Sequence, residues 1–314
     1  MTKKNNVQAQ AVQKILFFVL LAACFFPFVS PALALFAGLL LGFTLGNPYP
    51  DISSKASKYL LQLSVVGLGF GMDLFESLKS GKEGMLFTIV SVVLVLALGI
   101  FLGKAIKLHP KIAYLISSGT AICGGSAIAA VAPIVKANDD EISISIGTVF
   151  LLNAIALFIF PPIGRALGLS QEQFGIWAAI AIHDTSSVVG AGAAYGDKAL
   201  EIGTMVKLTR ALWIIPLAVF TTLFFKQKSQ KIYIPWFILF FVLAMIVNTY
   251  FNLPEKLTAA LIFGAKKGMT ITLFLIGSAL SVSVLKNVGI RPLLAGVALW
   301  LFIGLLSLGV ILWV

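Results

Sequence analysis

The sequence has little charge, only two cysteines and only two histidines. Asp, Glu, Lys and Arg make up 11% of its 314 residues, against about 25% in a typical soluble domain. Cys24 and Cys123 lie far apart in apolar surroundings, which argues against a disulfide framework and a cysteine-based metal site. Nucleotide-binding glycine loops, paired-histidine zinc motifs and serine-hydrolase elbows are also missing. We therefore expect no enzyme activity, no cofactor, no bound metal and no ATP-driven pumping.

Apolar residues dominate the composition instead of charged ones. They make up 59% of the chain and form runs of about 18 to 25 residues, the length with which an α-helix crosses a hydrocarbon core about 30 Å thick. The sequence therefore predicts an all-α polytopic membrane protein with eleven transmembrane helices, a cytoplasmic tail (1–14) and a single transporter domain (15–314). The expected spans are residues 15–29, 31–46, 56–73, 84–106, 111–135, 142–162, 173–194, 200–225, 232–250, 257–284 and 291–313.

The net charge of +11 is divided unevenly between the two sides of the expected membrane. With the N-terminus inside, fourteen basic residues fall on the cytoplasmic side and five fall outside, as the positive-inside rule requires. This predicts a bacterial inner membrane protein with a cytoplasmic N-terminus and an outer C-terminus, in contact with membrane lipid and without a nucleic-acid partner. The cytoplasmic set is Lys3, Lys4, Lys14, Lys55, Lys58, Lys104, Lys107, Lys111, Arg165, Lys226, Lys228, Lys231, Lys286 and Arg291; the outer set is Lys79, Lys82, Lys136, Lys198 and Lys256.

The N-terminal segment has a second reading. It resembles a lipoprotein signal peptide with Cys24 as the lipid acceptor, because Lys3 and Lys4 precede an apolar stretch that ends in "LAAC" at 21–24. The residues after Cys24, "FFPFVSPALALFAG", continue the apolar run instead of opening a polar mature domain. This continuation favours a first membrane span.

The stretch "SSGTAICGGSA" (117–127) is the first candidate site. Glycine costs about 1 kcal/mol relative to alanine inside a helix, so Gly124 and Gly125 predict two half-helices that meet near the middle of the membrane. Such a break offers free backbone amides at a half-helix N-terminus, which bind anions. Thr120, Cys123 and Ser126 lie beside it. The alternative is that small residues only let neighbouring helices pack closely.

The second candidate is "AIHDTSSVVGAG" (181–192), in the middle of an expected span. A charge at this depth costs about 2.5 to 3.5 kcal/mol and is by default a functional hypothesis. We expect His183 and Asp184 to carry a coupling ion, H⁺ or Na⁺, and Ser186 and Ser187 to contact the substrate. The alternative is a structural hydrogen bond to a neighbouring helix.

The third candidate is "GTMVKLTRA" (203–211). Thr204, Lys207 and Arg210 share one helix face because they follow one another at intervals of three. If Asp184, Lys207 and Arg210 were buried and unpaired, these three charges would cost roughly 8 to 10 kcal/mol. That cost is comparable with the stability of about 5 to 15 kcal/mol of a whole fold. We therefore expect Asp184 to pair with Lys207 or Arg210. One cation then remains to attract a small anionic substrate.

Weaker polar signals lie elsewhere in the apolar runs. Lys266 and Lys267, between glycines in "FGAKKGM", predict either a second helix break or an ordinary loop. Asn153 and Gln62 could line a cavity or form hydrogen bonds between helices, and the second is favoured.

Two internal similarities suggest a repeat. "LLQLSVVGLGFGMDL" (60–74) aligns with "TITLFLIGSALSVSV" (270–284), and these two spans run in opposite directions, as an inverted-topology repeat requires. A second similarity joins residues 126–154 to residues 187–211. Its spans run parallel in the eleven-span count, so one inverted duplication explains both similarities only if a segment is re-entrant or the number of spans is not eleven.

Five motifs in one order resemble a known family: "ISSGTAICGGSAIAAVAPIVKA", "AIHDTSSVVGAGAAYG", "VKLTRALWIIP", "KIYIPWF" and "LSVSVLKNVGIRPLL". They are similar to the YeiH-like conserved bacterial membrane proteins, which carry the family label of sulfate exporters. The likeness covers nearly the whole chain from about residue 32. It implies the superfamily of cation:proton antiporters and anion transporters, with inverted repeats and broken helices crossing near the membrane midplane. Family members often have Glu where this chain has Asp184, and alanines at Gly125 and Ser126, so substrate size stays open.

These observations together predict a secondary active transporter of a small anion, sulfate-like or a small organic acid. It would work by alternating access, coupled to H⁺ or Na⁺. One alternative is a cation:proton antiporter that uses Asp184, with the basic residues as structural counter-ions. Another is a passive channel or a non-transporting membrane scaffold. The substrate, the direction of transport and the oligomeric state stay open, with a homodimer as one option.

Overall fold

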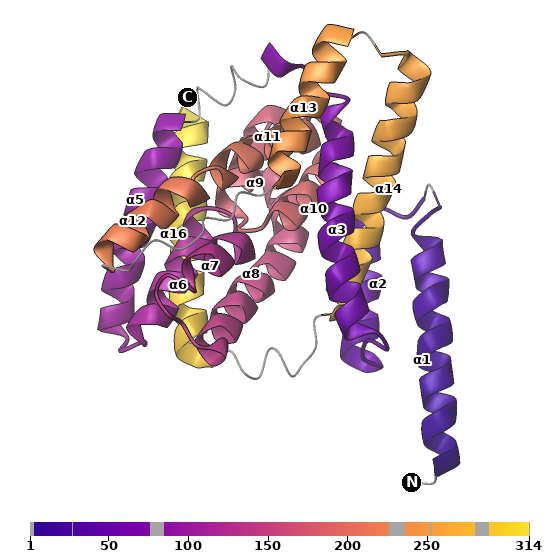
Figure 1. Cartoon of the computed structure of the whole chain (residues 1–314), viewed down its shortest axis with the longest axis horizontal. Helices are drawn as coiled ribbons and strands as arrows, with labels where there is room; N and C mark the ends of the chain where they lie inside the picture. Colours follow the sequence, from indigo (N-terminus) through magenta and orange to yellow (C-terminus); the bar gives the residue numbers. More distant parts are fainter. Residues whose placement is uncertain are drawn as a thin grey trace. The chain divides into compact units, whose positions relative to one another are not determined.

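The computed structural model describes residues 3–26, 28–75, 85–225, 236–251, 253–279 and 289–313, and every regular element in those ranges is an α-helix (Figure 1). Among these residues, five helices are long and apolar enough to cross a membrane, and three shorter ones are also apolar. The five are Phe87–Ala105, Asp139–Ala166, Asp197–Phe224, Glu255–Ala279 and Ile290–Trp313. The expectation of an all-helical chain built for a membrane is confirmed.

The chain divides into two compact units. Unit 1 consists of Met1–Leu74 and Phe237–Val284, and unit 2 of Phe75–Trp236 and Leu285–Val314. A single transporter domain over residues 15–314 stays a prediction.

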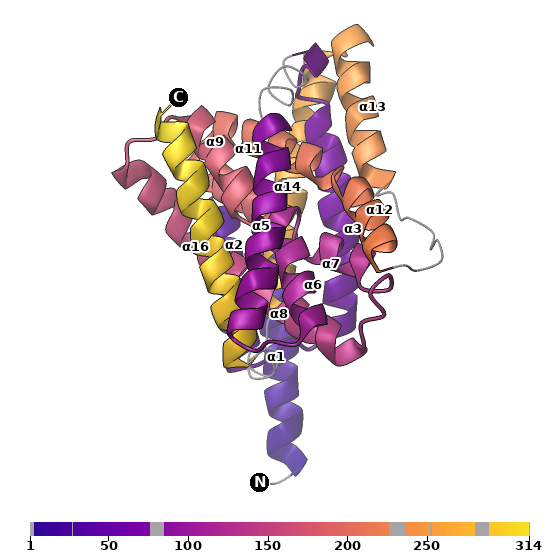
Figure 2. The ribbon, with the colours of Figure 1, turned by 90° about the vertical axis from the view of Figure 1, so that its left-hand side faces the viewer.

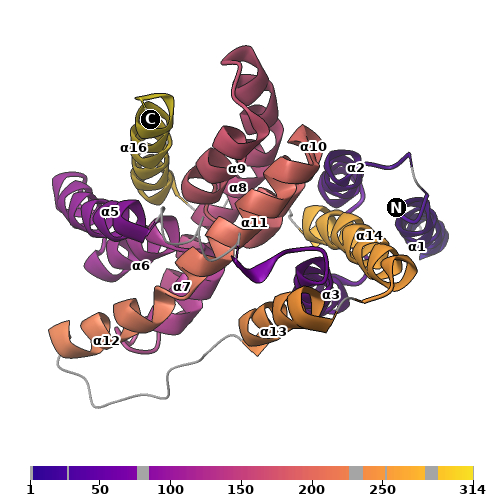
Figure 3. The same ribbon diagram turned by 90° about the horizontal axis from the view of Figure 1, so that it is seen from above.

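Unit 1 is built around α14, which lies between α2 and α3 (Figure 3). A Cβ on Gly277 would lie 2.6 Å from the Leu35 carbonyl oxygen, and one on Gly67 would lie 2.9 Å from the Ala265 Cβ. Both glycines therefore permit close helix packing. The helices of this unit are α1 (Lys3–Ala23), α2 (Pro31–Thr44), α3 (Pro50–Gly69), α13 (Trp236–Phe251) and α14 (Glu255–Ala279).

The first sequence similarity falls on α3 and α14. Gly67 approaches Ala265, and Ser64 approaches Gly268, so residue numbers rise along one helix as they fall along the other. The two helices run in opposite directions, as this similarity predicted.

Lys266 and Lys267 lie inside α14, which is continuous from Glu255 to Ala279. Both readings of this segment, a helix break and an ordinary loop, are therefore wrong. The neighbouring Gly268 is tolerated in the helix because it faces Ser64 of α3 at close range. The Lys267 Nζ donates a hydrogen bond of 2.5 Å to the Phe26 carbonyl oxygen.

Unit 2 has an apolar core to which α8, α9 and α16 contribute. Phe160 stacks on Trp177 with ring centroids 4.2 Å apart, and the Trp177 indole N–H donates to the Gly304 carbonyl oxygen at 2.9 Å. In Figure 2, α16 stands beside α5, with which it is in contact. The helices are α5 (Met85–Ala105), α6 (Pro110–Ala121), α7 (Gly125–Val131), α8 (Asp139–Ala166), α9 (Gln171–Ala181), α10 (Thr185–Tyr195), α11 (Asp197–Ala211), α12 (Ile214–Phe224) and α16 (Ile290–Trp313).

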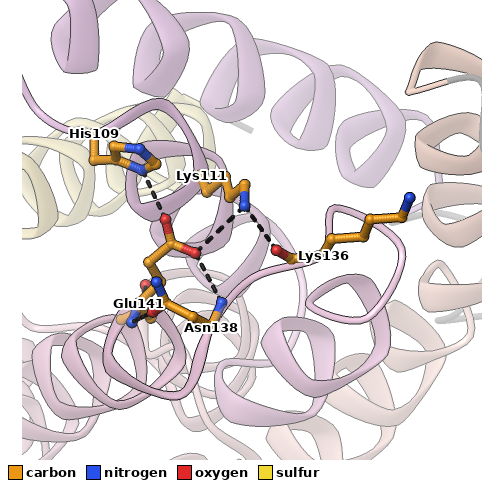
Figure 4. Close-up of polar contacts among 6 residues, drawn as sticks. His109, Lys111, Lys136, Asn138 and Glu141 are labelled. Carbon is orange, nitrogen blue, oxygen red and sulfur yellow. Dashed lines mark hydrogen bonds and ion pairs between the residues drawn. The ribbon is translucent and has the colours of Figure 1, made fainter.

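Residues 110–137, here named hairpin 1, contain α6 and α7 and return to the end from which they start. The Lys111 Nζ donates to the Lys136 carbonyl oxygen at 2.7 Å (Figure 4). Glu141, at the start of α8, accepts from the His109 Nδ1 at 2.9 Å and lies 3.7 Å from the Lys111 Nζ. Two residues in direct contact cannot stand on opposite sides of a core about 30 Å thick. The expected span over residues 111–135 is therefore wrong, and this segment turns back on itself.

Residues 171–195, here named hairpin 2, contain α9 and α10 and are closed in the same way. The Arg165 Nη2 donates to the Ala194 carbonyl oxygen, and the Tyr195 hydroxyl donates to the Leu169 carbonyl oxygen, both at 2.6 Å. The expected span over residues 173–194 is therefore also wrong. Hairpin 1 begins at the N-terminal end of α8 and hairpin 2 at its C-terminal end.

This arrangement shows the directions of the two segments in the second sequence similarity. In the second one, α7 and α8 correspond to α10 and α11. Gly203 of α11 packs on Gly175 near the start of α9, and Lys207 reaches the Ile182 carbonyl oxygen at the end of α9, so α11 runs from the base of hairpin 2 toward its tip. Along α8, Asn153 meets the tip and Gly164 meets the base. The two segments therefore run in opposite directions, because neither hairpin crosses.

Candidate functional site

The tips of the two hairpins meet in unit 2. Gly124 separates α6 from α7 with a φ of 65°, a left-handed conformation that favours glycine. A Cβ at Gly124 would lie 3.3 Å from the Asp184 Cβ and 3.4 Å from the His183 carbonyl oxygen. The break that the sequence predicted at Gly124 is thus adjacent to the break between α9 and α10, which the sequence did not predict.

Asp184 caps the N-terminus of α10. Its carboxylate accepts from the backbone amides of Ser186 and Ser187 at 3.1 and 3.2 Å and from the Ser187 hydroxyl at 3.0 Å. The Ser186 hydroxyl makes a short hydrogen bond to the same carboxylate. Such capping satisfies amides that a helix start leaves free. These α10 amides and serine hydroxyls are therefore used within the hairpin.

The expected ion pair of Asp184 with Lys207 or Arg210 is wrong. Among the described residues, neither cation lies within ion-pairing distance of that carboxylate. The physical reason is that the carbonyl oxygens at half-helix ends, which carry a partial negative charge, take the place of the carboxylate as partners of the two cations.

Lys207 binds the end of α9. Its side chain is fully buried, and its Nζ donates to the carbonyl oxygens of Ile182 at 2.7 Å and Ala179 at 3.2 Å. The last carbonyls of a helix have no partner inside the helix and carry a partial negative charge. Lys207 supplies both the donors and the positive charge.

Arg210 binds the end of α6, the first half-helix of hairpin 1, in the same way. Its Nη2 donates to the Ala121 carbonyl oxygen at 2.5 Å, at the end of α6, and its Nη1 donates to the Ser91 hydroxyl of α5 at 3.1 Å. The guanidinium is fully buried. One face of α11 therefore places a cation at the C-terminus of the first half-helix of each hairpin.

Asn153 is a further polar contact at this junction. Its Oδ1, from the middle of α8, accepts from the backbone amides of His183 at 3.0 Å and Asp184 at 3.3 Å. This is the hydrogen bond between helices that the sequence favoured for Asn153. Ser91 was missed, because one hydroxyl in an apolar helix carries no distinctive signal.

The other predicted residues differ in burial. Cys123 is buried in the break and interacts electrostatically with Lys207 and Asp184. Gly125 is partly exposed and Ser126 is exposed on α7. The structure gathers most of the candidate set at the hairpin tips and leaves Ser126 outside the buried cluster. The gathered residues are Thr120, Cys123, Gly124, His183, Asp184, Ser186, Ser187, Lys207 and Arg210.

Comparison with known proteins identifies a family. Residues 16–296 match the family model described as conserved hypothetical protein 698. The chain belongs to that family. It is 60% identical over 285 residues to a UPF0324 membrane protein of Bacteroides thetaiotaomicron, covering 90% of this chain and 86% of that protein. This match confirms the resemblance to YeiH-like conserved bacterial membrane proteins.

Other members of this family match over almost their whole length. A UPF0324 membrane protein of Porphyromonas gingivalis is 51% identical over 325 residues, with 98% of each chain covered. The UPF0324 membrane protein Bd1437 of Bdellovibrio bacteriovorus is 47% identical over 317 residues, covering 98% of this chain and 97% of that protein. No solved structure matches the chain. The family names and the long apolar helices together place this chain in a membrane.

Proposed function

We propose that the protein is a secondary active transporter that moves a small anion across the bacterial inner membrane by alternating access. The observation that carries this proposal is the meeting of two re-entrant hairpin tips beside two buried cations. Discontinuous helices of this kind hold substrate and ions at the middle of secondary transporters.

The depth of the hairpins supports a site inside the membrane. α6 has 12 residues and α9 has 11, so each reaches about 17 Å at 1.5 Å per residue, roughly half of the hydrocarbon core. Non-helical backbone at that depth is tolerated only where it is buried in protein or lines a watery cavity. A pathway for a polar substrate is the function that makes such breaks useful.

We also propose that the two hairpins belong to an inverted repeat. Hairpin 1 with α8 and hairpin 2 with α11 have the same connectivity and run in opposite directions. Equivalent halves of opposite orientation can exchange conformations, which opens the site first to one side and then to the other.

The distribution of charge supports a cytoplasmic N-terminus. Because hairpin 1 is re-entrant, Lys136 moves to the cytoplasmic side and Arg165 moves to the outer side, and the count stays at fourteen against five. Hairpin 1 would then open from the cytoplasm, where its base holds Lys107, Lys111 and Lys136.

The excess of positive charge favours an anionic substrate. Lys207 and Arg210 are fully buried beside one acid, Asp184. We propose that the substrate binds between the tips, near Thr120, Cys123 and Gly124, and that His183 and Asp184 couple transport to H⁺ or Na⁺. Four further residues stay candidates for contacts with the substrate that form when the hairpins move: Gly125, Ser126, Ser186 and Ser187.

Transport in proteoliposomes tests this function. Counterflow of a labelled small anion should occur with the wild type and should fall severalfold in Arg210→Gln. The matched control is Lys198→Gln, at the exposed start of α11 beside the base of hairpin 2. Each variant must elute as a single species after purification. Proton-coupled Na⁺ flux that is lost in Asp184→Asn would instead support a cation:proton antiporter. Absence of any coupled flux would leave a channel or a scaffold.

A further inference from the structure

Four side chains at the hairpin tips keep buried hydrogen-bonding atoms without a partner. None of these atoms finds one in the part of the chain that the structure describes. Buried polar atoms in native proteins are almost always satisfied, so several orphans at one junction indicate a polar occupant. The atoms are Thr120 Oγ1, Asn153 Nδ2, both ring nitrogens of His183 and Arg210 Nε.

These side chains come from four different elements that converge. The Asn153 amide holds the His183 backbone at 3.0 Å. Arg210 holds the Ala121 carbonyl oxygen, which adjoins Thr120 in α6, and Arg210 also interacts electrostatically with His183. The four residues therefore lie on the elements that meet at this junction: α6, α8, α11 and the turn between α9 and α10.

Thr120 differs from the other hydroxyls of its helix. Ser117 and Ser118 donate to the carbonyl oxygens four residues back, at 2.6 and 2.8 Å. The Thr120 hydroxyl makes no such bond although it is equally buried. It is thus free to bind a group from outside the helix.

The orphaned atoms are mostly donors. Arg210 Nε–H and the Asn153 amide nitrogen can only donate, and the Thr120 hydroxyl can donate. A neutral imidazole has one donor and one acceptor. The occupant that satisfies them has several acceptor oxygens and one O–H.

The charge of the junction limits the charge of the occupant. The junction holds two basic residues, Lys207 and Arg210, and one acidic residue, Asp184, a formal excess of one positive charge. A monoanion neutralises it, whereas a dianion leaves a buried negative charge without compensation.

We propose that the site binds a small oxyanion of single negative charge that retains one proton, the chemical class of bicarbonate. This rests on the proposed function, since it names the substrate class of the same site. The acceptor nitrogen of His183 accepts a hydrogen bond from the O–H of the anion. Thr120, Asn153 and Arg210 donate to its oxygens. A dianion such as sulfate fits neither the charge nor the pattern of donors.

Thermal unfolding of the purified full chain in detergent tests this class. Bicarbonate and nitrate share a planar shape and a single charge, but only bicarbonate has an O–H. At pH 7.5 and constant ionic strength, with chloride as the baseline, bicarbonate should raise the midpoint of unfolding in a saturable way. Nitrate and sulfate should each bind at least about tenfold more weakly.

Two pairs of variants locate the site. Thr120→Val should weaken bicarbonate binding about tenfold, whereas Thr204→Val should not, because the buried Thr204 hydroxyl is already bonded to the Leu200 carbonyl oxygen at 2.6 Å. His183→Phe should remove the preference for bicarbonate over nitrate, whereas His109→Phe, at the exposed base of hairpin 1, should keep it.

The outcomes separate this inference from the proposed function. Nitrate or sulfate binding as tight as bicarbonate, together with anion counterflow, overturns the substrate class and leaves the transporter standing. Bicarbonate binding that Thr120→Val does not weaken overturns the location. If no anion shifts the midpoint and none is transported, both proposals fall.

Discussion

Lys207 and Arg210 stand three residues apart on α11 and hold the ends of two different hairpins. Lys207 donates to the Ile182 carbonyl oxygen at the end of α9, and Arg210 donates to the Ala121 carbonyl oxygen at the end of α6. A single helix therefore fixes the breaks of both re-entrant segments. The first consequence concerns stability.

Replacing Lys207 should destabilise the protein strongly. Lys207→Met leaves two buried carbonyl oxygens without donors, and each unsatisfied group costs about 1 to 3 kcal/mol. Lys198→Met is the control, because its exposed ion pair with Glu201 contributes about 1 kcal/mol or less. Thermal unfolding in detergent should separate the two variants clearly. Equal midpoints would show that Lys207 does not stabilise the end of α9.

Gly124→Ala should disturb the junction of the tips. The positive φ of 65° costs a residue with a Cβ about 1 to 2 kcal/mol, and the added atom would lie 3.3 Å from Asp184. Gly309→Ala is the control, since a Cβ there meets nothing within 4 Å and alanine favours the helix. We expect a lower midpoint of unfolding for the first variant and an equal or higher one for the second. A neutral Gly124→Ala would contradict the described turn.

Labelling of single cysteines should place both ends of hairpin 1 on one side of the membrane. In a background with Cys24→Ser and Cys123→Ser, residues 111 and 136 should react from the cytoplasm and residue 198 from the outside. The reason is the 2.7 Å contact between the Lys111 Nζ and the Lys136 carbonyl oxygen. Reaction of positions 111 and 136 from opposite sides would restore a crossing span.

Glu141→Ala should loosen the base of hairpin 1. The substitution removes the side-chain half of the capping box, the hydrogen bond from the Asn138 amide to the Glu141 carboxylate, and the contacts to His109 and Lys111, which together contribute about 1 to 2 kcal/mol. Asp140→Ala, at an exposed position of the same first turn, is the control. Limited proteolysis should cut the 105–110 segment faster in Glu141→Ala than in wild type or control. Identical cleavage rates would refute this role.

The break at Gly124 could be predicted from the sequence, whereas the break at His183 and Asp184 and the partners of both could not. Gly124 and Gly125 interrupt an apolar run, but His183 and Asp184 indicated only a buried ionisable pair. The partners of Lys207 and Arg210 are backbone carbonyls, which every residue has, so no residue type announces them. Asp184 was expected to pair with a cation because the sequence does not show that it can cap its own helix.

The turning back of the two hairpins could not be predicted from the composition of their segments either. Residues 111–135 have the length and composition of a crossing helix, and only the contact of Lys111 with Lys136 shows that they turn back. The similarity of residues 126–154 to 187–211 contained this information, because it fits opposite directions only if the hairpins do not cross. The glycines around Lys266 and Lys267 suggested a break or a loop where α14 is continuous. Flanking glycines can serve helix packing as well as a break.

The bond between Arg210 and Ala121 joins residues 89 positions apart. Hairpin 1 leaves the ribosome long before α11 does, and its polar tip cannot remain at membrane depth while the end of α6 is uncapped. Its final seating must therefore wait for α11, so biogenesis cannot follow the order of the sequence. A chain truncated before residue 197 should insert α8 and leave residues 117–127 exposed to water-soluble thiol reagents.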